Sequence, residues 1–258
     1  MSEVDKQTLR ETIAAACRIL ALLGVVRETT GHISARTGSN RMLIRCRSNR
    51  EAGLIVTEPE AIRELTFDGD GLFAGDADYE RPSELPIHGE IYRARPEVMA
   101  VVHAHPYASV VCSLAGLRMQ PIFGAYDPNS MALGDAGVPT YPRSILIKQK
   151  ATAHEMIGSM GDKSVCVLHG HGVVTTGESV EEATIRAIKL ETLAGVTLDV
   201  AKAGGTPVPL SDEDLEFFRK RASGTAGVSR EHMKDIWKWT WRHYLKLLSN
   251  SEQGPGRA

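Results

Sequence analysis

The sequence predicts an α/β protein in which a central, mostly antiparallel sheet is flanked by helices in α/β/α layers. Short alternating or β-branched apolar segments recur along the chain, and helical segments lie between them without a regular strand–helix–strand alternation. The 258 residues are enough to bury a core. Apolar residues make up 42% of the chain and charged residues 24%, which is typical of a globular protein in water.

The first third of the chain predicts one helix followed by strands. Apolar residues at helical spacing indicate a helix over residues 6–26, ending near Gly24. Strands are expected at residues 29–38, at 41–48, and on both sides of a turn at Pro59 within residues 53–71. In the second of these strands, Met42, Ile44 and Cys46 alternate with Arg45 and Arg47.

The rest of the chain alternates between strands and helices. We expect a helix within residues 81–96, capped by Ser83 and stopped by Pro96. A strand at 98–106, a helix at 107–116, a strand and a helix within 143–162, two strands at 164–177 and a long helix from Ser179 with a capping box to Glu182 should follow. We expect residues 1–210 to form one domain and residues 211–258 a helical extension with an aromatic tail.

Charge and composition exclude several functions. The net charge of −2 leaves no basic surplus for a nucleic acid. No apolar segment approaches the roughly 20 residues of a membrane-spanning helix, so no membrane partner is expected. The polar N-terminus is unlike a signal peptide. The four cysteines, none in a CxxC pair, indicate buried thiols and a cytoplasmic protein.

Two histidine pairs are the strongest chemical signal. His103 and His105 end a β-branched segment in VVHAHP, and His169 and His171 lie in LHGHGVV. Residues i and i+2 of a strand point to the same face, so both imidazoles of a pair can reach one ion. Three neutral imidazoles with open positions are the usual form of a catalytic zinc-type site. The alternative is that one pair has a structural role.

Glu84 is the candidate proton carrier beside such an ion, because it directly precedes an apolar helix. Its alternative role is structural, since an acidic residue at a helix N-terminus interacts favourably with the helix dipole. A dry pocket should raise the pKa of this carboxyl group above that of a free one, although a cation opposes the shift.

The segment RPSELPIHGEIYRARPEVMAVVHAHP, with TGHISAR before it and LHGHGVVTTGESVEEA after it, closely resembles the class II aldolase/adducin family. The resemblance implies a class II aldolase-like fold with a nine-stranded, largely antiparallel sheet. It also implies a homotetramer or larger homo-oligomer with sites at subunit interfaces. Within the family pattern Glu84 is the acid/base, and His103, His105 and His171 hold one divalent cation. His169 would support the site from a second shell.

The implied chemistry is shared by several reactions. A cation takes up the negative charge that builds as a carbon–carbon bond breaks, and Glu84 moves a proton to or from carbon. Aldol cleavage, epimerisation and decarboxylation can all proceed in this way. Zinc, manganese, iron or cobalt would suit the three imidazoles. Neither NAD nor PLP is expected.

Departures from the family pattern favour one branch. Sugar-phosphate aldolases usually have Gly-Asn where this chain has Gly31 and His32. The segments LIRCRSNREAGL, PIFGAYDPNSMAL and GVPTYPRS resemble metal-dependent decarboxylases of hydroxylated aromatic dicarboxylates, of the dihydroxyphthalate type. We therefore expect a non-oxidative decarboxylase of a substrate such as 3,4-dihydroxyphthalate, acting through a metal-stabilised enolate or phenolate.

Four residues are expected to bind this substrate. His32 and Tyr126 are candidates from the resemblance, with Arg143 as a further one. Arg45 and Arg47 are expected on one strand face, where their guanidinium groups suit carboxylates. The alternative for the arginines is a solvated strand edge or a subunit salt bridge.

Two other functions stay open. One is a class II aldolase or epimerase acting on a hydroxy-keto compound or a sugar phosphate. The other is a non-catalytic scaffold like the adducin head, which keeps the fold without the metal site. The complete set of Glu84 and the three histidines argues against the scaffold.

Overall fold

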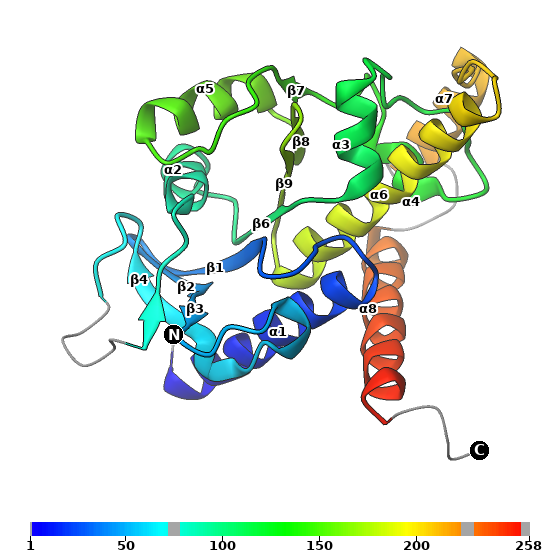
Figure 1. Cartoon of the computed structure of the whole chain (residues 1–258). Coiled ribbons are helices and arrows are strands. Elements are labelled where there is room, and N and C mark those ends of the chain that lie inside the picture. Colours follow the sequence, from blue (N-terminus) through cyan, green and yellow to red (C-terminus); the bar gives the residue numbers. More distant parts are fainter. Residues whose placement is uncertain (1, 72–77, 223–229, 254–258) are drawn as a thin grey trace.

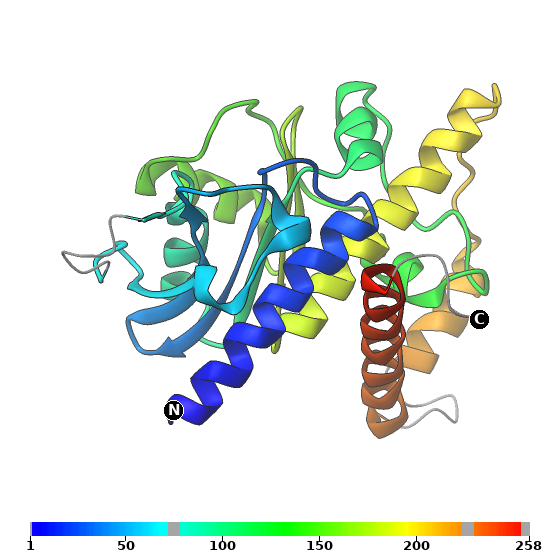
Figure 2. The same ribbon diagram turned by 60° about the horizontal axis from the view of Figure 1, so that its bottom comes forward.

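The computed structural model describes residues 2–71, 78–222 and 230–253 (Figure 1). Within them, seven strands form a central sheet in the order β4-β2-β1-β6-β9-β8-β7, antiparallel except for the β7–β8 pair. Helices cover both faces of this sheet, as the two views show (Figures 1 and 2). The α/β/α layers and the mostly antiparallel sheet are confirmed.

The strands of the central sheet are β1 (His32–Gly38), β2 (Arg41–Arg45), β4 (Ile62–Thr66), β6 (Ala100–Ala104), β7 (Thr140–Tyr141), β8 (Val165–Leu168) and β9 (Gly172–Gly177). Strands β3 (Arg47–Ser48) and β5 (Tyr79–Glu80) form a separate pair. The expected nine-stranded sheet is therefore wrong for the described residues, because the chain leaves the central sheet after Arg45.

The α-helices are α1 (Glu3–Leu22), α2 (Leu85–Ala94), α3 (Tyr107–Leu114), α4 (Pro128–Leu133), α5 (Lys150–Met160), α6 (Val180–Lys202), α7 (Asp212–Ala222) and α8 (Arg230–Glu252). Two 3-10 helices, η1 (Leu54–Val56) and η2 (Pro59–Ala61), precede β4. The helix α4 was not expected from the sequence.

Three local expectations are wrong. Residues 54–56 form η1 in place of a strand, with Leu54 turned into the core. Residues 143–147 form no strand, and the Ile147 N–H donates to a side chain instead of to a ladder. The N-cap of α2 is Glu84 and not Ser83, and no side chain caps that helix.

The alternation of side chains along β6 separates two cores. Val102, Ala100 and Ala104 pack in the layer that contains α1, α3 and α6. Val101 packs in the other layer, with α2 and α5. A central strand covered on both faces is apolar along its length, which explains the near-continuous apolar run before His103.

The long helix α6 starts where the sequence predicts. Ser179 accepts a hydrogen bond from the Glu182 N–H at 3.2 Å. The Glu182 carboxylate, however, accepts from the Glu178 N–H at 2.6 Å and not from the cap residue itself. The predicted capping box is thus half formed, with the return bond shifted by one residue.

The aromatic tail packs on the core of its own chain. Tyr244 and Leu248 on α8 are buried, and Trp237 and Trp241 on the same side of the helix are partly buried against the same cluster. Their spacing of three and four residues lays one stripe along α8, which contacts α1 and α6 (Figure 2). Residues 223–229 and 254–258 of the expected extension lie outside the described residues.

Two sequence-based exclusions can be compared with the structure. No described helix has both the length and the apolar character needed to cross a bilayer. Cys17, Cys46, Cys112 and Cys166 are all free and buried, as expected.

If α8 is part of the folded core, Leu248→Ala should lower the free energy of unfolding by about 2–5 kcal/mol, because it leaves a cavity at a side chain that is 4% exposed. Urea denaturation measures this change. Leu245→Ala on the same helix is the control, since Leu245 is 38% exposed. Equal and small effects of the two substitutions would contradict the packing described.

Candidate metal centre

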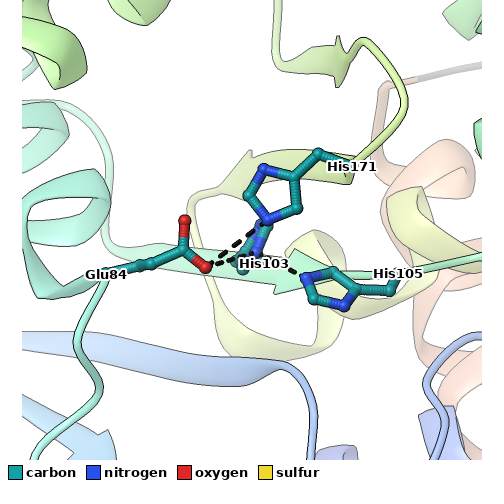
Figure 3. Close-up of side chains that lie close together, drawn as sticks. All are labelled: Glu84, His103, His105 and His171. Atoms are coloured by element: carbon teal, nitrogen blue, oxygen red, sulfur yellow. Dashed lines mark hydrogen bonds and ion pairs between the residues drawn. The ribbon is translucent and has the colours of Figure 1, made fainter. Parts of the chain in front are cut away.

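One carboxylate and three imidazoles converge at one end of the sheet (Figure 3). His103 is the penultimate residue of β6, and His105 lies just beyond the strand. His171 lies in the turn between β8 and β9, and Glu84 lies at the start of α2. Their ligand atoms all lie within 4.8 Å of one another. The structure therefore brings together the four residues expected at a metal site.

The four groups face one another across short distances. The Glu84 Oε2 atom lies 3.5 Å from His103 Nε2 and 3.4 Å from His171 Nε2. The His105 Nε2 atom lies 3.0 Å from His103 Nε2. His103 and Glu84 are buried, at 1% and 5% exposure, so that little water competes for these atoms.

The hydrogen bonds show which nitrogen atoms are free to bind an ion. His103 Nδ1 lies 3.0 Å from the Val173 carbonyl oxygen. Because a carbonyl can only accept, Nδ1 carries a hydrogen, and Nε2 is the ring nitrogen that faces the cluster. Both ring nitrogens of His171 are buried without a hydrogen-bond partner among the described residues. A divalent cation could bind one ring nitrogen of each of the three imidazoles, so the residues fit such an ion.

Burial and the neighbouring imidazoles together set the protonation states of His105 and Glu84. Burial, and next the neighbouring His103, lower the pKa of His105 to about 3, so its imidazole is neutral. Burial acts to raise the pKa of Glu84, but His103 and His171 outweigh it and hold that pKa well below the usual range. The expectation of a raised pKa for Glu84 is wrong, because the adjacent imidazoles lower this pKa by more than the dry pocket raises it.

The backbone fixes the orientation of Glu84. Its Oε1 atom accepts a hydrogen bond from the Ile147 N–H at 2.7 Å, while Oε2 faces the imidazoles. One oxygen thus anchors the side chain, and the other is directed at the cluster (Figure 3).

A second carboxylate holds the segment that follows His105. Glu191 on α6 accepts hydrogen bonds from the backbone N–H groups of Ala108 and Ser109, at 2.7 and 2.9 Å. The N-cap of α3, Pro106, offers no side-chain cap. Glu191 therefore caps α3 from another helix and fixes the turn that carries His105.

His32 borders this cluster, whereas His169 does not join it. His32 on β1 lies opposite His103 on β6 in the strand register, and their ring centroids are 5.0 Å apart. His169 lies in the β8–β9 turn, where its backbone N–H donates to the Tyr141 carbonyl at 3.0 Å. A supporting role for the His169 side chain stays a prediction.

The expected common face of Arg45 and Arg47 is wrong. Arg45 ends β2, is 3% exposed, and pairs with Glu51 at 2.5 Å. Arg47 begins β3 in the separate sheet and is exposed. The chain changes sheets between the two residues, so the alternation assumed for one strand does not apply. Substrate contacts for either arginine stay predictions.

Two other candidates lie outside the cluster. Tyr126 is 74% exposed, and its ring stands edge-on to that of Phe123 at 5.4 Å. Arg143 pairs with Glu155 at 2.8 Å, and both side chains are about half exposed. Within one chain, the structure does not bring either residue to the metal centre.

Sequence reasoning missed a buried polar group next to His32. Its members are His88 and Tyr92 on α2 and Ser34 on β1. Burial, and next the nearby His103, lower the pKa of His88 to about 3, so this imidazole is neutral. The sequence does hold a signal for it, because Glu84, His88 and Tyr92 are spaced by four residues and share one helix face.

Comparisons with known proteins agree with the fold and show the family. The profile of the Class II Aldolase and Adducin N-terminal domain matches residues 11–198. The chain is 46% identical to a 3,4-dihydroxyphthalate decarboxylase of Arthrobacter keyseri over 208 residues, 80% of this chain and 84% of that protein. A 3,4-dihydroxyphthalate decarboxylase of Terrabacter sp. (strain DBF63) is 42% identical, over 86% of this chain and 94% of that protein.

A solved structure extends the likeness over almost the whole fold. The L-fuculose 1-phosphate aldolase from Glaciozyma antarctica PI12 matches with a TM-score of 0.76 at 18% identity, covering 99% of this chain and 94% of that one. At this low identity the match shows a shared fold alone.

Removal of the Glu191 carboxylate tests its capping role. Glu191→Ala should lower the free energy of unfolding by about 1–3 kcal/mol, because it leaves the Ala108 and Ser109 N–H groups without their acceptor. Chemical denaturation measures the loss. Asp199→Ala on the same helix is the control, since that side chain is 76% exposed. If the two variants were equally stable, α3 would not depend on Glu191.

Proposed function

Because the chain belongs to the class II aldolase and adducin family, we propose that it is a divalent-metal-dependent, non-oxidative decarboxylase of a hydroxylated aromatic dicarboxylate such as 3,4-dihydroxyphthalate. The cluster of one carboxylate and three imidazoles carries the proposal of a metal-dependent lyase. The similarity to two 3,4-dihydroxyphthalate decarboxylases supports the substrate class.

The cation would be held by His103, His105 and His171. Zinc, manganese, iron or cobalt would suit three neutral imidazoles. When bound, the cation supplies a Lewis acid that takes up negative charge developing on the substrate. The reaction transfers no hydride and involves no amine, so it needs neither NAD nor PLP.

Glu84 would carry the proton of the reaction. The low pKa of its carboxyl group leaves it ionised at rest, so it can first accept the proton of a substrate hydroxyl group at Oε2. One substrate carboxylate then leaves as CO2, and the electron pair of the broken bond stays on the ring carbon. Glu84 returns its proton to that carbon, and the deprotonated hydroxyl oxygen takes up one proton from water, which gives a dihydroxybenzoate and leaves Glu84 ionised as at the start. The Ile147 N–H holds Glu84 in place throughout.

We further propose a cytoplasmic homotetramer or larger homo-oligomer, with residues 1–210 as the catalytic domain and 211–258 as a helical extension. The exposed ring of Tyr126 would then contact substrate in a neighbouring copy, since its own chain does not bring it to the metal centre. The four free, buried thiols suit a reducing compartment.

The substrate decides between the candidate functions. Metal-loaded protein incubated with 3,4-dihydroxyphthalate should release CO2 and a dihydroxybenzoate, a chelator should abolish this turnover, and added divalent cation should restore it. Mass spectrometry of the products measures the outcome. Aldehyde release from fuculose phosphate, without CO2 from the dicarboxylate, would favour an aldolase. The absence of both metal binding and turnover of either substrate would favour a scaffold.

Substitution of the proposed proton carrier tests its role. Glu84→Gln should lower kcat by more than about 100-fold, because an amide cannot accept and return the proton. Bound metal, measured by elemental analysis, should be kept. Glu155→Gln is the control, since Glu155 is half exposed and pairs with Arg143 outside the cluster. Normal turnover of the Glu84 variant would remove this residue from the mechanism.

A further inference from the structure

A continuous line of buried polar side chains runs from the edge of the metal centre into the core beneath α2. His32 Nδ1 lies 2.6 Å from His88 Nε2, and His88 Nδ1 lies 2.6 Å from Ser34 Oγ. Ser34 Oγ lies 2.8 Å from the Tyr92 hydroxyl oxygen. His32 is 7% exposed, and the other three side chains are exposed by 1% or less.

Tyr92, at the end of this line away from the metal centre, determines the direction of every hydrogen bond in the line. In the described part of the chain, the Tyr92 hydroxyl group has one hydrogen-bonding partner, Ser34 Oγ. The Tyr92 O–H must therefore donate to Ser34 Oγ, because a buried hydroxyl hydrogen without an acceptor is unfavourable by about 1–3 kcal/mol.

The remaining hydrogens follow in order. Since Ser34 Oγ accepts from Tyr92, its own hydrogen is free to donate to His88 Nδ1. The neutral ring of His88 has one N–H hydrogen, which must then lie on Nε2 and donate to His32 Nδ1. The hydrogen of a neutral His32 ring is thereby left on Nε2, the one ring nitrogen outside the line.

We propose that Tyr92, Ser34 and His88 are positioning residues that hold His32 in the Nε2–H form, so that His32 presents a fixed hydrogen-bond donor to an anionic oxygen of the substrate. The contact with substrate rests on the proposed function. The tautomer rests on the hydrogen-bond geometry alone.

The chemistry of the site favours this form over the two others. The opposite tautomer would direct a lone pair at an anionic oxygen and repel it. A charged imidazolium would repel a cation beside His103, whose ring centroid is 5.0 Å away. A neutral donor held in place stabilises charge that develops on the substrate oxygen without reorganisation during the reaction.

The stability of the fold alone does not require such a line of buried hydrogen bonds. Each hydrogen bond inside the core replaces one to water, and matched apolar side chains in both positions would be nearly as stable. The order of the groups, end to end toward the metal centre, is what an orienting role requires.

Neutron diffraction of the whole protein, exchanged into D2O, tests the tautomer directly. Deuterium is expected on Nε2 of both His32 and His88. Deuterium on Nδ1 of His32 would overturn the proposal. This test needs no substrate, so its failure is separate from failure of the decarboxylase assignment.

Kinetics on the substrate that the protein turns over tests the consequence. Tyr92→Phe removes only the hydroxyl group and should lower kcat by about 10-fold, with bound metal and Tm close to those of the parent protein. Tyr141→Phe is the matched control, since Tyr141 is also buried but donates to Glu155 at 2.8 Å. Equal turnover of these two variants would overturn the proposal.

A double-mutant cycle separates orientation from packing. His32→Gln supplies an amide donor that does not depend on a ring tautomer. In that background Tyr92→Phe should cause no further loss of kcat, because the two residues act through one another. An undiminished 10-fold loss would assign Tyr92 a merely structural role and overturn the proposal.

Discussion

The strand register between β1 and β6 is the constraint on which the site depends. It places His32 directly opposite His103, on the sheet face that α2 covers. Side chains alternate with a period of two, so a slip of β1 by one residue would turn His32 into the apolar layer beneath α6. Ile33, which packs in that layer, would then take the place of His32 beside His103. The burial of apolar side chains in the layer beneath α6 therefore favours the β1–β6 register in which the polar residues of the site come together.

The charges of the site affect the stability of the folded chain as well as the proposed reaction. Burial keeps the nearby imidazoles of His105 and His88 neutral, whereas Glu84 is ionised beside them. The Ile147 N–H donates to Oε1 of this carboxylate, and Oε2 faces the imidazoles. A cation among the imidazole nitrogens would add positive charge beside Oε2, and metal binding would then also stabilise the folded chain. The same arrangement thus serves both the proposed chemistry and the stability of the loaded protein.

Periodicity in the sequence predicted most of the elements that build the site, including β6, the β8–β9 pair and the capped start of α6. The spacing of His103 and His105 predicted a shared direction, but their meeting with His171 and Glu84 came from the family resemblance. A backbone donor such as Ile147 has no residue signature and could not be predicted. The break between Arg45 and Arg47 was also hidden, because alternation continues in the sequence where the chain changes sheets.

One face of α2 carries both the proposed proton carrier and part of the hydrogen-bonded line to His32. Glu84, His88 and Tyr92 occupy successive turns of α2. The distance of α2 from the sheet and its rotation therefore fix the positions of the proposed proton carrier and of the line to His32 at the same time. Gly89 fixes that depth, because a Cβ atom there would lie 2.2 Å from the Phe67 carbonyl oxygen. Glycine inside a helix costs about 1 kcal/mol relative to alanine. Glycine is nevertheless required at this position, because the helix must approach the neighbouring backbone closely enough for His88 to reach Ser34 and His32.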